Sequence, residues 1–443
     1  MSDTRTCAEI DGRTPVPRSL RRVALAARSN LVRVATTRVR GLGPLYLAGF
    51  TTAFGAHGVA AALGTETDDI GLTFATLGLI LAIYDVAEVI LKPIFGALSD
   101  RIGVKPVVVG GLLVFALAST LGAFAATPIA LAVARLGQGA AAAAFSPASS
   151  SAVARLVGPS LAGRYFGKYG SWKGLGYAAG PLIGAGLIMW SGLPALFLAL
   201  AGLALAAAIW TALAMTPLPV LPKQRATLIE LVRQSTAPAF LGPVILLSVA
   251  TATLGVAVGF LPLIGSQLGL DPIFGMGAVT VLAVVSAVVQ PRIGRLHDTA
   301  PERVLLIMGI GAGTLIVAIG LVAVAPSLLT IIVTAVLVGL GVGSITPLGF
   351  ARLAATTPPE RMGRTMGSAE LGREVGDAGG PILVGVVAGA TTLPLALGVM
   401  AATSALASGI GSVLARQANT VPEDSKRPRH RKAVRETGAR MTM

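Results

Sequence analysis

The chain of 443 residues is poor in charged, aromatic and cysteine residues, and each shortage argues against a class of protein. Only 12% of the residues are charged and 54% are hydrophobic, so a soluble protein of this composition would lack a polar surface. The single cysteine, Cys7, excludes an intrachain disulfide and suits a reduced, cytoplasmic compartment. Aromatic residues make up 5% and do not interleave with basic ones, which argues against nucleic-acid binding despite a net charge of +15.

The sequence also lacks the short motifs of intramembrane enzymes and ATP-driven pumps. It has no Gly-x-x-x-x-Gly-Lys-Ser/Thr phosphate loop, no His-Glu-x-x-His zinc motif and no Gly-x-Ser-x-Gly nucleophile motif. We therefore expect a protein that is not an enzyme and that uses neither a metal nor a bound cofactor.

Long apolar runs fill most of the chain. A membrane-spanning helix needs about 20 mostly apolar residues. Twelve runs of this kind lie near 42–63, 73–97, 106–126, 128–148, 170–190, 194–215, 242–264, 273–293, 304–325, 327–349, 366–388 and 393–415. We predict an all-α membrane protein with twelve transmembrane helices. The polar, Arg-rich residues before the first run do not resemble a cleavable signal peptide.

The basic residues lie on one side of the predicted membrane. Nine Arg occur in residues 1–41 and eight Lys or Arg in residues 416–443. All but four of the remaining Lys and Arg residues lie in the loops after spans 2, 4, 6, 8 and 10. The loops on the opposite side of the membrane carry only acidic charges. By the positive-inside rule, we expect a multi-pass protein of the plasma membrane with both termini in the cytoplasm. The basic tails should also attract anionic lipid headgroups.

The two halves of the chain resemble each other. A shift of 200 positions aligns Pro147 with Pro347, Pro159 with Pro359, Gly163–Arg164 with Gly363–Arg364, Gly167 with Gly367, and Gly180–Pro181 with Gly380–Pro381. We predict parallel six-helix repeats, which are typical of secondary transporters. The predicted parts are a basic N-terminal tail at 1–41, a bundle at 42–215, a cytoplasmic linker at 216–241, a second bundle at 242–415 and a basic C-terminal tail at 416–443.

The loop between spans 2 and 3 interrupts the apolar sequence with "GALSDRIGVK", residues 96–105. This pattern resembles the loop signature of the major facilitator superfamily, and the matching positions are Gly96, Leu98, Asp100, Arg101, Gly103 and Lys105. The resemblance implies the major facilitator fold, with Asp100 closing a cytoplasmic gate against the start of span 11. The alternative is a loop that only sets topology. The copy in the second half, which ends at Asp298, is degraded in sequence.

A segment of the fourth span resembles a further motif of this family. In "RLGQG", residues 135–139, the resemblance implies that Arg135 tunes the proton affinity of a nearby carboxylate. An acid in span 1 would be the usual partner, but span 1 offers His57, so the partner of Arg135 stays open. His57 is either a packing residue or a proton relay.

The fifth span contains "GYAAGPLIGAG", residues 176–186, which resembles the antiporter signature of the family. The matching positions are Gly176, Gly180, Pro181 and Gly184. The resemblance implies a drug:proton antiporter and therefore favours export over uptake. The alternative is that the glycines serve only close helix packing.

Two predicted spans carry charged residues at helical spacing, so each set forms one stripe along its helix. The stripes are Asp85, Glu88 and Lys92 in span 2, and Glu370, Arg373, Glu374 and Asp377 in span 11. Because a charge that faces lipid is costly, each stripe should face the bundle interior. We expect Asp85 and Asp377, and then Glu374, to bind a proton or a cationic substrate. Further candidates are Glu88, Arg135, Arg373 and His57.

An alternative reading pairs these charges within each helix. The pairs would be Glu88 with Lys92 and Arg373 with Asp377. Glu370 is expected near the gate, beside Arg101, and Lys173 is expected to extend toward the cytoplasmic surface.

Together these features predict a secondary transporter that exports small amphiphilic or drug-like molecules in exchange for protons, by alternating access. The expected partners are a small-molecule substrate, protons and membrane lipids, without nucleic acid and without a second subunit. The proton gradient would supply the energy. The alternative is proton-coupled uptake of a sugar, an organic acid or another small metabolite, against which the antiporter-like signature argues. A sensor that does not transport would have lost the charges within the membrane.

Overall fold

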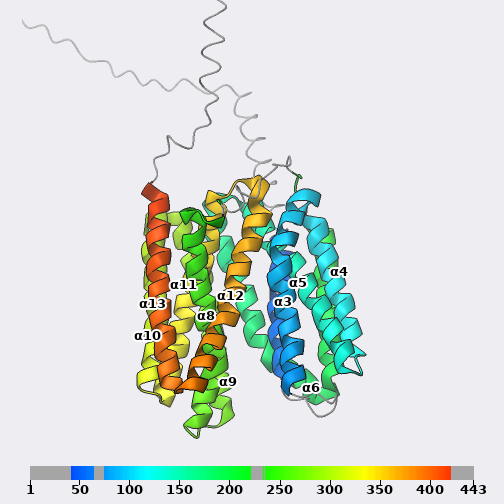
Figure 1. Ribbon diagram of the computed structural model, residues 1–443. Helices are drawn as coiled ribbons and strands as arrows, with labels where there is room; N and C mark the ends of the chain where they lie inside the picture. The colour runs from blue at the N-terminus through cyan, green and yellow to red at the C-terminus, as the bar shows by residue number, and fades with distance from the viewer. Residues whose placement is uncertain (1–40, 64–73, 221–232, 234, 421–443) are drawn as a thin grey trace, which may run out of the picture.

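The computed structural model describes residues 41–63, 74–220, 233 and 235–420. These residues form long α-helices joined by short connections (Figure 1). The long helices are α2 (Leu42–Leu63), α3 (Phe74–Ile102), α4 (Val104–Ala123), α5 (Pro128–Val157), α6 (Ala162–Ala214), α8 (Pro238–Gln267), α9 (Pro272–Thr299), α10 (Val304–Val324), α11 (Leu328–Thr356), α12 (Met362–Ala390) and α13 (Leu393–Thr420). Short 3-10 helices precede three of them: η1 (Pro159–Leu161), η2 (Pro301–Arg303) and η3 (Pro359–Arg361).

The helix α6 contains two of the predicted spans. Its backbone leaves the helical region at Ser191 and Gly192, and Gly192 has a φ of 71° that favours glycine. With α6 counted as two segments, the described residues hold twelve membrane-length helical segments, and each predicted span corresponds to one of them. The prediction of an all-α, twelve-span membrane fold is confirmed.

Several helices extend beyond the predicted spans because an apolar run ends at the first polar residues, whereas the helix continues through them. The helix α5 runs to Val157 and ends at Gly158, whose φ is 74°. Among the described residues, eight helices are individually long and apolar enough to cross a membrane. The charged helices α3 and α12 are not among these eight. Three of their charged residues, Lys92, Glu370 and Glu374, instead find partners on other helices, as described below.

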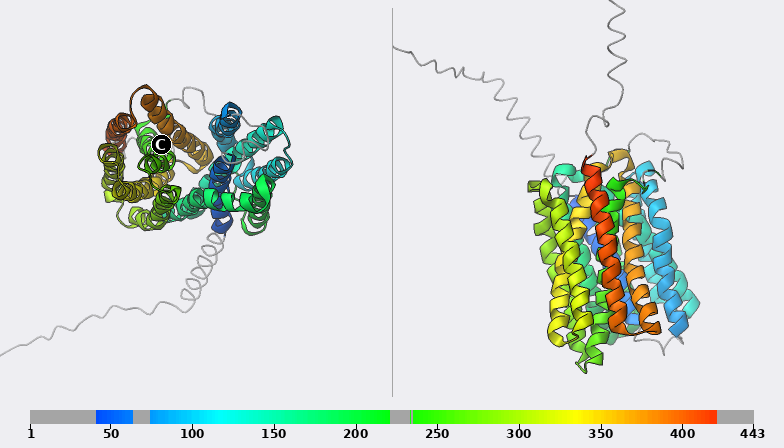
Figure 2. Two further views of the ribbon diagram at one scale, coloured as in Figure 1. Left: turned by 90° about the horizontal axis from the view of Figure 1, so that it is seen from below. Right: turned by 60° about the vertical axis from the view of Figure 1, so that its left-hand side comes forward.

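The helices form two bundles, α2–α6 and α8–α13, which lie next to each other when viewed along the helix axes (Figure 2, left). The helix α3 packs against α12, and α6 packs against α9, so these two pairs form the seam between the bundles. We call the end where α2 begins and α6 and α13 finish the tail end, and the opposite end the far end. The predicted tail at 1–41 lies outside the described residues except for Gly41, and much of the linker also lies outside them. At the other terminus, α13 continues into the predicted C-terminal tail as far as Thr420.

Candidate functional site

The loop signature at 96–105 joins the two bundles at the tail end. The carboxylate of Asp100, at the end of α3, accepts hydrogen bonds from the backbone N–H groups of Gly363 (2.8 Å) and Arg364 (3.0 Å). These N–H groups belong to the first turn of α12, where a helix leaves its donors unsatisfied and favours a negative charge. The contact that the family resemblance implies is therefore present, and we call it the first latch.

Glycine makes the first latch possible. A Cβ atom on Gly96 would lie 2.5 Å from the carbonyl oxygen of Gly363, so only glycine lets α3 and α12 approach this closely. Gly103, with a φ of 98°, makes the turn between α3 and α4. Arg101 is exposed and Lys105 is half-buried.

The second half of the molecule repeats this arrangement. Asp298, at the end of α9, accepts hydrogen bonds from the backbone N–H groups of Gly163 (3.0 Å) and Arg164 (3.1 Å) in the first turn of α6. A Cβ atom on Gly294 would collide with the carbonyl oxygen of Gly163. We call this contact the second latch. The motif is degraded in sequence but complete in its chemistry, because the contact requires only the carboxylate and the close glycine.

A buried lysine joins α3 to α12 further from the tail end. The Nζ atom of Lys92 lies 3.0 Å from a carboxylate oxygen of Glu88 and 2.6 Å from one of Glu374. The pair within α3 was one of the predicted alternatives. Its link to Glu374 crosses the seam and was not predicted. Arg373 and Asp377 were the other predicted pair. In the described structure, the nitrogen atoms of Arg373 and the carboxylate oxygens of Asp377 are more than 4.0 Å apart, so the two residues do not form an ion pair.

Glu370 forms a second buried link between the bundles. Its carboxylate accepts hydrogen bonds from the hydroxyl groups of Ser146 (2.5 Å) and Ser150, both on α5, and lies 3.6 Å from the Nζ atom of Lys173 on α6. The expectation that Glu370 joins the gate beside Arg101 is therefore wrong. The expectation that Lys173 extends toward the surface is also wrong, because its side chain is buried against this carboxylate.

The sequence feature that indicates this link is a pair of serines one helical turn apart on an apolar span. Ser146 and Ser150 are fully buried, and a buried hydroxyl normally has a hydrogen-bond partner. Their hydroxyl groups carry no charge, so the pattern of charges in the spans does not indicate them.

The partner of Arg135 lies on α3 rather than on α2. The centre of its guanidinium lies 4.2 Å from the centroid of the Tyr84 ring, and its Nη1 atom donates to the side-chain oxygen of Gln138 (3.0 Å). Asp85 and Glu88, also on α3, act on it electrostatically. His57 on α2 interacts with Arg135 electrostatically, but its hydrogen bond and ring contact are with Ala53 and Tyr177.

Asp85 departs from the prediction that the whole stripe of α3 faces the bundle interior. Its side chain is exposed, although it lies on the same stripe as the buried Lys92. The helices α3 and α12 touch at Gly96 and Gly367 near the tail end, and Asp85 lies nearer the far end. Asp377, which is half-buried, is among the groups that interact electrostatically with Asp85. Both acids are thus less buried than Lys92 on the same seam.

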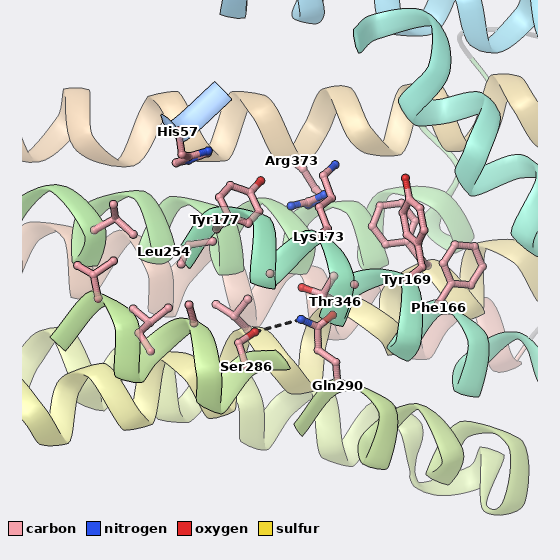
Figure 3. A pocket seen from close by; sticks show the side chains of 18 residues that line it. His57, Phe166, Tyr169, Lys173, Tyr177, Leu254, Ser286, Gln290, Thr346 and Arg373 are labelled. Atoms are coloured by element: carbon pink, nitrogen blue, oxygen red, sulfur yellow. Dashed lines mark hydrogen bonds between the residues drawn. The ribbon is translucent and has the colours of Figure 1, made fainter. Parts of the chain in front are cut away.

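A cavity lies between the bundles and is lined by α2, α6, α8, α9, α11 and α12 (Figure 3). Its polar lining residues are His57, Tyr169, Lys173, Tyr177, Ser286, Gln290, Thr346 and Arg373. Asp85, Asp377 and the glutamates of the two stripes are not among the lining residues. Among the described residues, no three His, Cys, Asp or Glu side chains are grouped as metal ligands.

His57 forms part of the cavity wall. Its Nδ1 atom lies 3.2 Å from the carbonyl oxygen of Ala53, so this nitrogen carries a hydrogen and donates it. The ring packs edge-on against Tyr177, with 4.2 Å between the centroids. Its other nitrogen is therefore free to take part in hydrogen bonding with the cavity contents.

The glycines of the antiporter-like signature pack α6 against α2. A Cβ atom on Gly176 would lie 2.6 Å from the carbonyl oxygen of Phe50, and one on Gly180 would lie 2.8 Å from the backbone nitrogen of Gly58. Gly184 also faces Gly58, and Pro181 lies inside the helix. The glycines therefore serve close helix packing, which is the alternative that the sequence left open for this motif. The same packing brings His57 and Tyr177 together.

Comparisons with known proteins agree with this architecture. The family model described as Major Facilitator Superfamily matches residues 45–321 and 307–440. Among curated proteins, "Multidrug resistance protein MdtG" of Klebsiella pneumoniae (strain 342) is 32% identical over 138 residues, which are 31% of this chain and 34% of that protein. "Multidrug resistance protein 3" of Bacillus subtilis (strain 168) is 35% identical over 127 residues, 29% of this chain and 25% of that protein. The matched segments thus span about a third or less of these relatives.

Solved structures share the fold over most of the chain. The human organic anion transporter MFSD10 (TETRAN) superposes with a TM-score of 0.69 at 19% identity, covering 86% of this chain and 99% of that one. The transporter FucP in its outward conformation gives a TM-score of 0.71 at 16% identity, with the same coverage. The predicted family is confirmed, and the chain belongs to the Major Facilitator Superfamily.

Proposed function

We propose that this protein is a proton-coupled exporter of small amphiphilic molecules that works by alternating access. The observation that carries the proposal is the pair of latches at the tail end, where Asp100 and Asp298 each hold the first turn of a helix in the other bundle. Two related contacts at one end, formed by equivalent segments of two repeats, are what a rocking transporter needs to close that end. The names of the multidrug resistance relatives support export.

The orientation follows from the positive-inside rule. The tail end collects the basic residues, so we place it, with both termini, in the cytoplasm of a cell whose plasma membrane holds the protein as a monomer. Closure at the tail end then makes this conformation outward-facing. In a background without cysteine (Cys7→Ser), cysteines introduced at 64–72 or 265–272 should react with an impermeant thiol reagent from outside, and those at 216–241 only from inside. The reverse pattern would overturn the orientation.

The less buried acids of the two stripes are the proposed proton carriers. Asp85 and Asp377 are repelled electrostatically by Glu374, which itself bonds to Lys92 across the seam. Close acids repel each other, so proton uptake is favoured where carboxylates outnumber nearby bases. Rocking of the bundles must break the bond between Lys92 and Glu374, and a proton on Glu374 weakens that bond.

Transport in proteoliposomes tests the proposal. Vesicles that contain the purified protein would be offered a panel of amphiphilic dyes, with and without an imposed proton gradient. We expect dye to move against its own gradient and in the direction opposite to the protons, and to stop when an ionophore collapses the gradient. Movement of solute in the same direction as the protons would contradict antiport and support proton-coupled uptake instead.

A further inference from the structure

The charged side chains that line the cavity between the bundles, among the described residues, are both basic. They are Lys173 from α6 and Arg373 from α12, and none of the described carboxylates lines the cavity with them (Figure 3). They occupy equivalent positions in the two repeats and repel each other electrostatically. A cationic molecule that entered this cavity would meet the guanidinium of Arg373, and beside it Lys173, whose ammonium group lies 3.6 Å from the Glu370 carboxylate.

Arg373 has no ion-pair partner among the described residues. Its side chain is 5% exposed, its Nε atom has no hydrogen-bond partner, and no described carboxylate comes within 4.0 Å of its guanidinium. Asp377 interacts with it electrostatically without forming an ion pair, and its other two acidic neighbours are held elsewhere. Glu374 bonds to Lys92 at 2.6 Å, and Glu370 is held by two serines and Lys173.

A buried, unpaired guanidinium in a cavity is a site for an anion. Its planar array of N–H donors matches a carboxylate or a similar oxyanion in two parallel hydrogen bonds. The rest of the cavity wall is largely apolar and includes Leu254, Val258 and Leu282. The amide of Gln290 also lines the cavity and has a buried oxygen without a hydrogen-bond donor.

We propose that the substrates are amphiphilic organic anions, whose acidic group binds to Arg373 with the support of Lys173 and whose apolar body lies against α8 and α9. This inference rests on the proposed transport function and names the chemical class of its substrate. It also shifts the expected role of the charged residues. Asp85 and Asp377 lie outside the cavity lining, which leaves them available for protons rather than for a cationic substrate.

A set of matched probes tests the charge preference by binding alone. We would measure equilibrium binding of 2-naphthoate, its neutral analogue 2-naphthamide and the cation (2-naphthylmethyl)trimethylammonium to the full-length protein in nanodiscs, with empty nanodiscs as the blank. We expect naphthoate to bind about tenfold or more tightly than naphthamide, because a charged, bidentate hydrogen bond is lost in the amide. The cation should bind more weakly still.

Variants assign the preference to the cavity. Arg373→Gln should abolish the difference between naphthoate and naphthamide, Arg373→Lys should retain part of it, and Lys173→Gln should reduce it. The matched control is Arg295→Gln, which removes an exposed positive charge from the tail end of α9 and should change nothing. The comparison of probes on the unmodified protein remains decisive even if a variant fails to fold.

Two results would overturn the inference. One is naphthoate binding that is absent or no tighter than that of naphthamide or the cation, and the other is an unchanged preference in a folded Arg373→Gln variant. Binding needs no proton gradient, so this test can fail while the test of proton-driven transport succeeds, and the reverse. If proton-driven export of a cationic dye is observed without naphthoate binding, the transporter proposal stands and the substrate class is wrong.

Discussion

At the scale of single residues, the charges within the membrane divide into two groups. Lys92, Glu88, Glu374 and Glu370 have partners at ion-pair or hydrogen-bond distance, and most of these links cross the seam. Arg373 has no such partner among the described residues, and Asp85 is exposed. Buried charges that are paired hold a structure in one state, and unpaired ones are left for a ligand or a proton.

Neutralising Asp85 or Asp377 should separate coupling from binding. We expect Asp85→Asn and Asp377→Asn to lose uphill efflux driven by a proton gradient and to keep substrate exchange at equal concentrations, because the side chain can no longer release and rebind a proton. Efflux, exchange and folded yield would be measured together, with Glu302→Gln as the control at an exposed site. Full proton-driven efflux in both single variants and in the double variant would exclude these two residues as carriers.

Removing the shared lysine should destabilise the protein. Lys92→Met leaves Glu88 and Glu374 buried without their common base, and loss of one member of a buried ion pair costs about 3–5 kcal/mol. We expect a clear fall in the thermal unfolding temperature, with partial recovery in Lys92→Met/Glu374→Gln. An unfolding temperature equal to that of the unmodified protein would show that the link across the seam does not form.

At the scale of helices, glycine decides which elements meet. The helices α3 and α12, and likewise α6 and α9, approach closely at glycines, which face either another glycine or the backbone carbonyl of a larger residue such as Lys92 or Gln290. The same residue type holds α2 against α6. A larger side chain at one of these glycine positions should therefore push the two helices apart.

Adding bulk at the seam should stop transport while leaving membrane insertion intact. Gly96→Leu and Gly294→Leu place a side chain where a backbone carbonyl of the other bundle lies, so the tail end cannot close. Gly110→Leu in α4 is the matched control, because its added Cβ meets nothing within 4 Å. Transport rates normalised to the amount of inserted protein check this. Normal transport by Gly96→Leu would show that the loop at 96–105 only sets the topology of the chain and does not close the tail end.

The helices could be predicted from the sequence because each apolar run is long enough to span a membrane. Even α12 was identified despite four charges, since the alternation of basic loops requires a span there. The links across the seam could not be predicted in the same way. Glu370 and Ser146 lie 224 positions apart, and a single sequence does not fix how each helix is rotated about its axis. The segment that ends at Asp298 matches the loop signature at few positions, yet it keeps the carboxylate that accepts the two backbone hydrogen bonds.

At the scale of the whole molecule, the hydrogen bonds and ion pairs between the bundles lie toward the tail end and along the seam, and the cavity lies between the bundles. The two latches are equivalent in the two repeats, so loss of one should leave the other to hold the tail end in part. Loss of both should free it. This is the central claim, because alternating access requires an end that closes through contacts that can be broken.

The distance between the bundles at the tail end tests this claim most directly. Spin labels attached through Ile102→Cys on α3 and Arg303→Cys in η2, in the Cys7→Ser background, report it by double electron–electron resonance, and both sites are exposed. We predict a single short distance in the unmodified protein, a partial shift to longer distances in Asp100→Asn or Asp298→Asn, and a predominantly longer distance when both are replaced. A distance distribution that is the same in the double variant as in the unmodified protein would contradict the account.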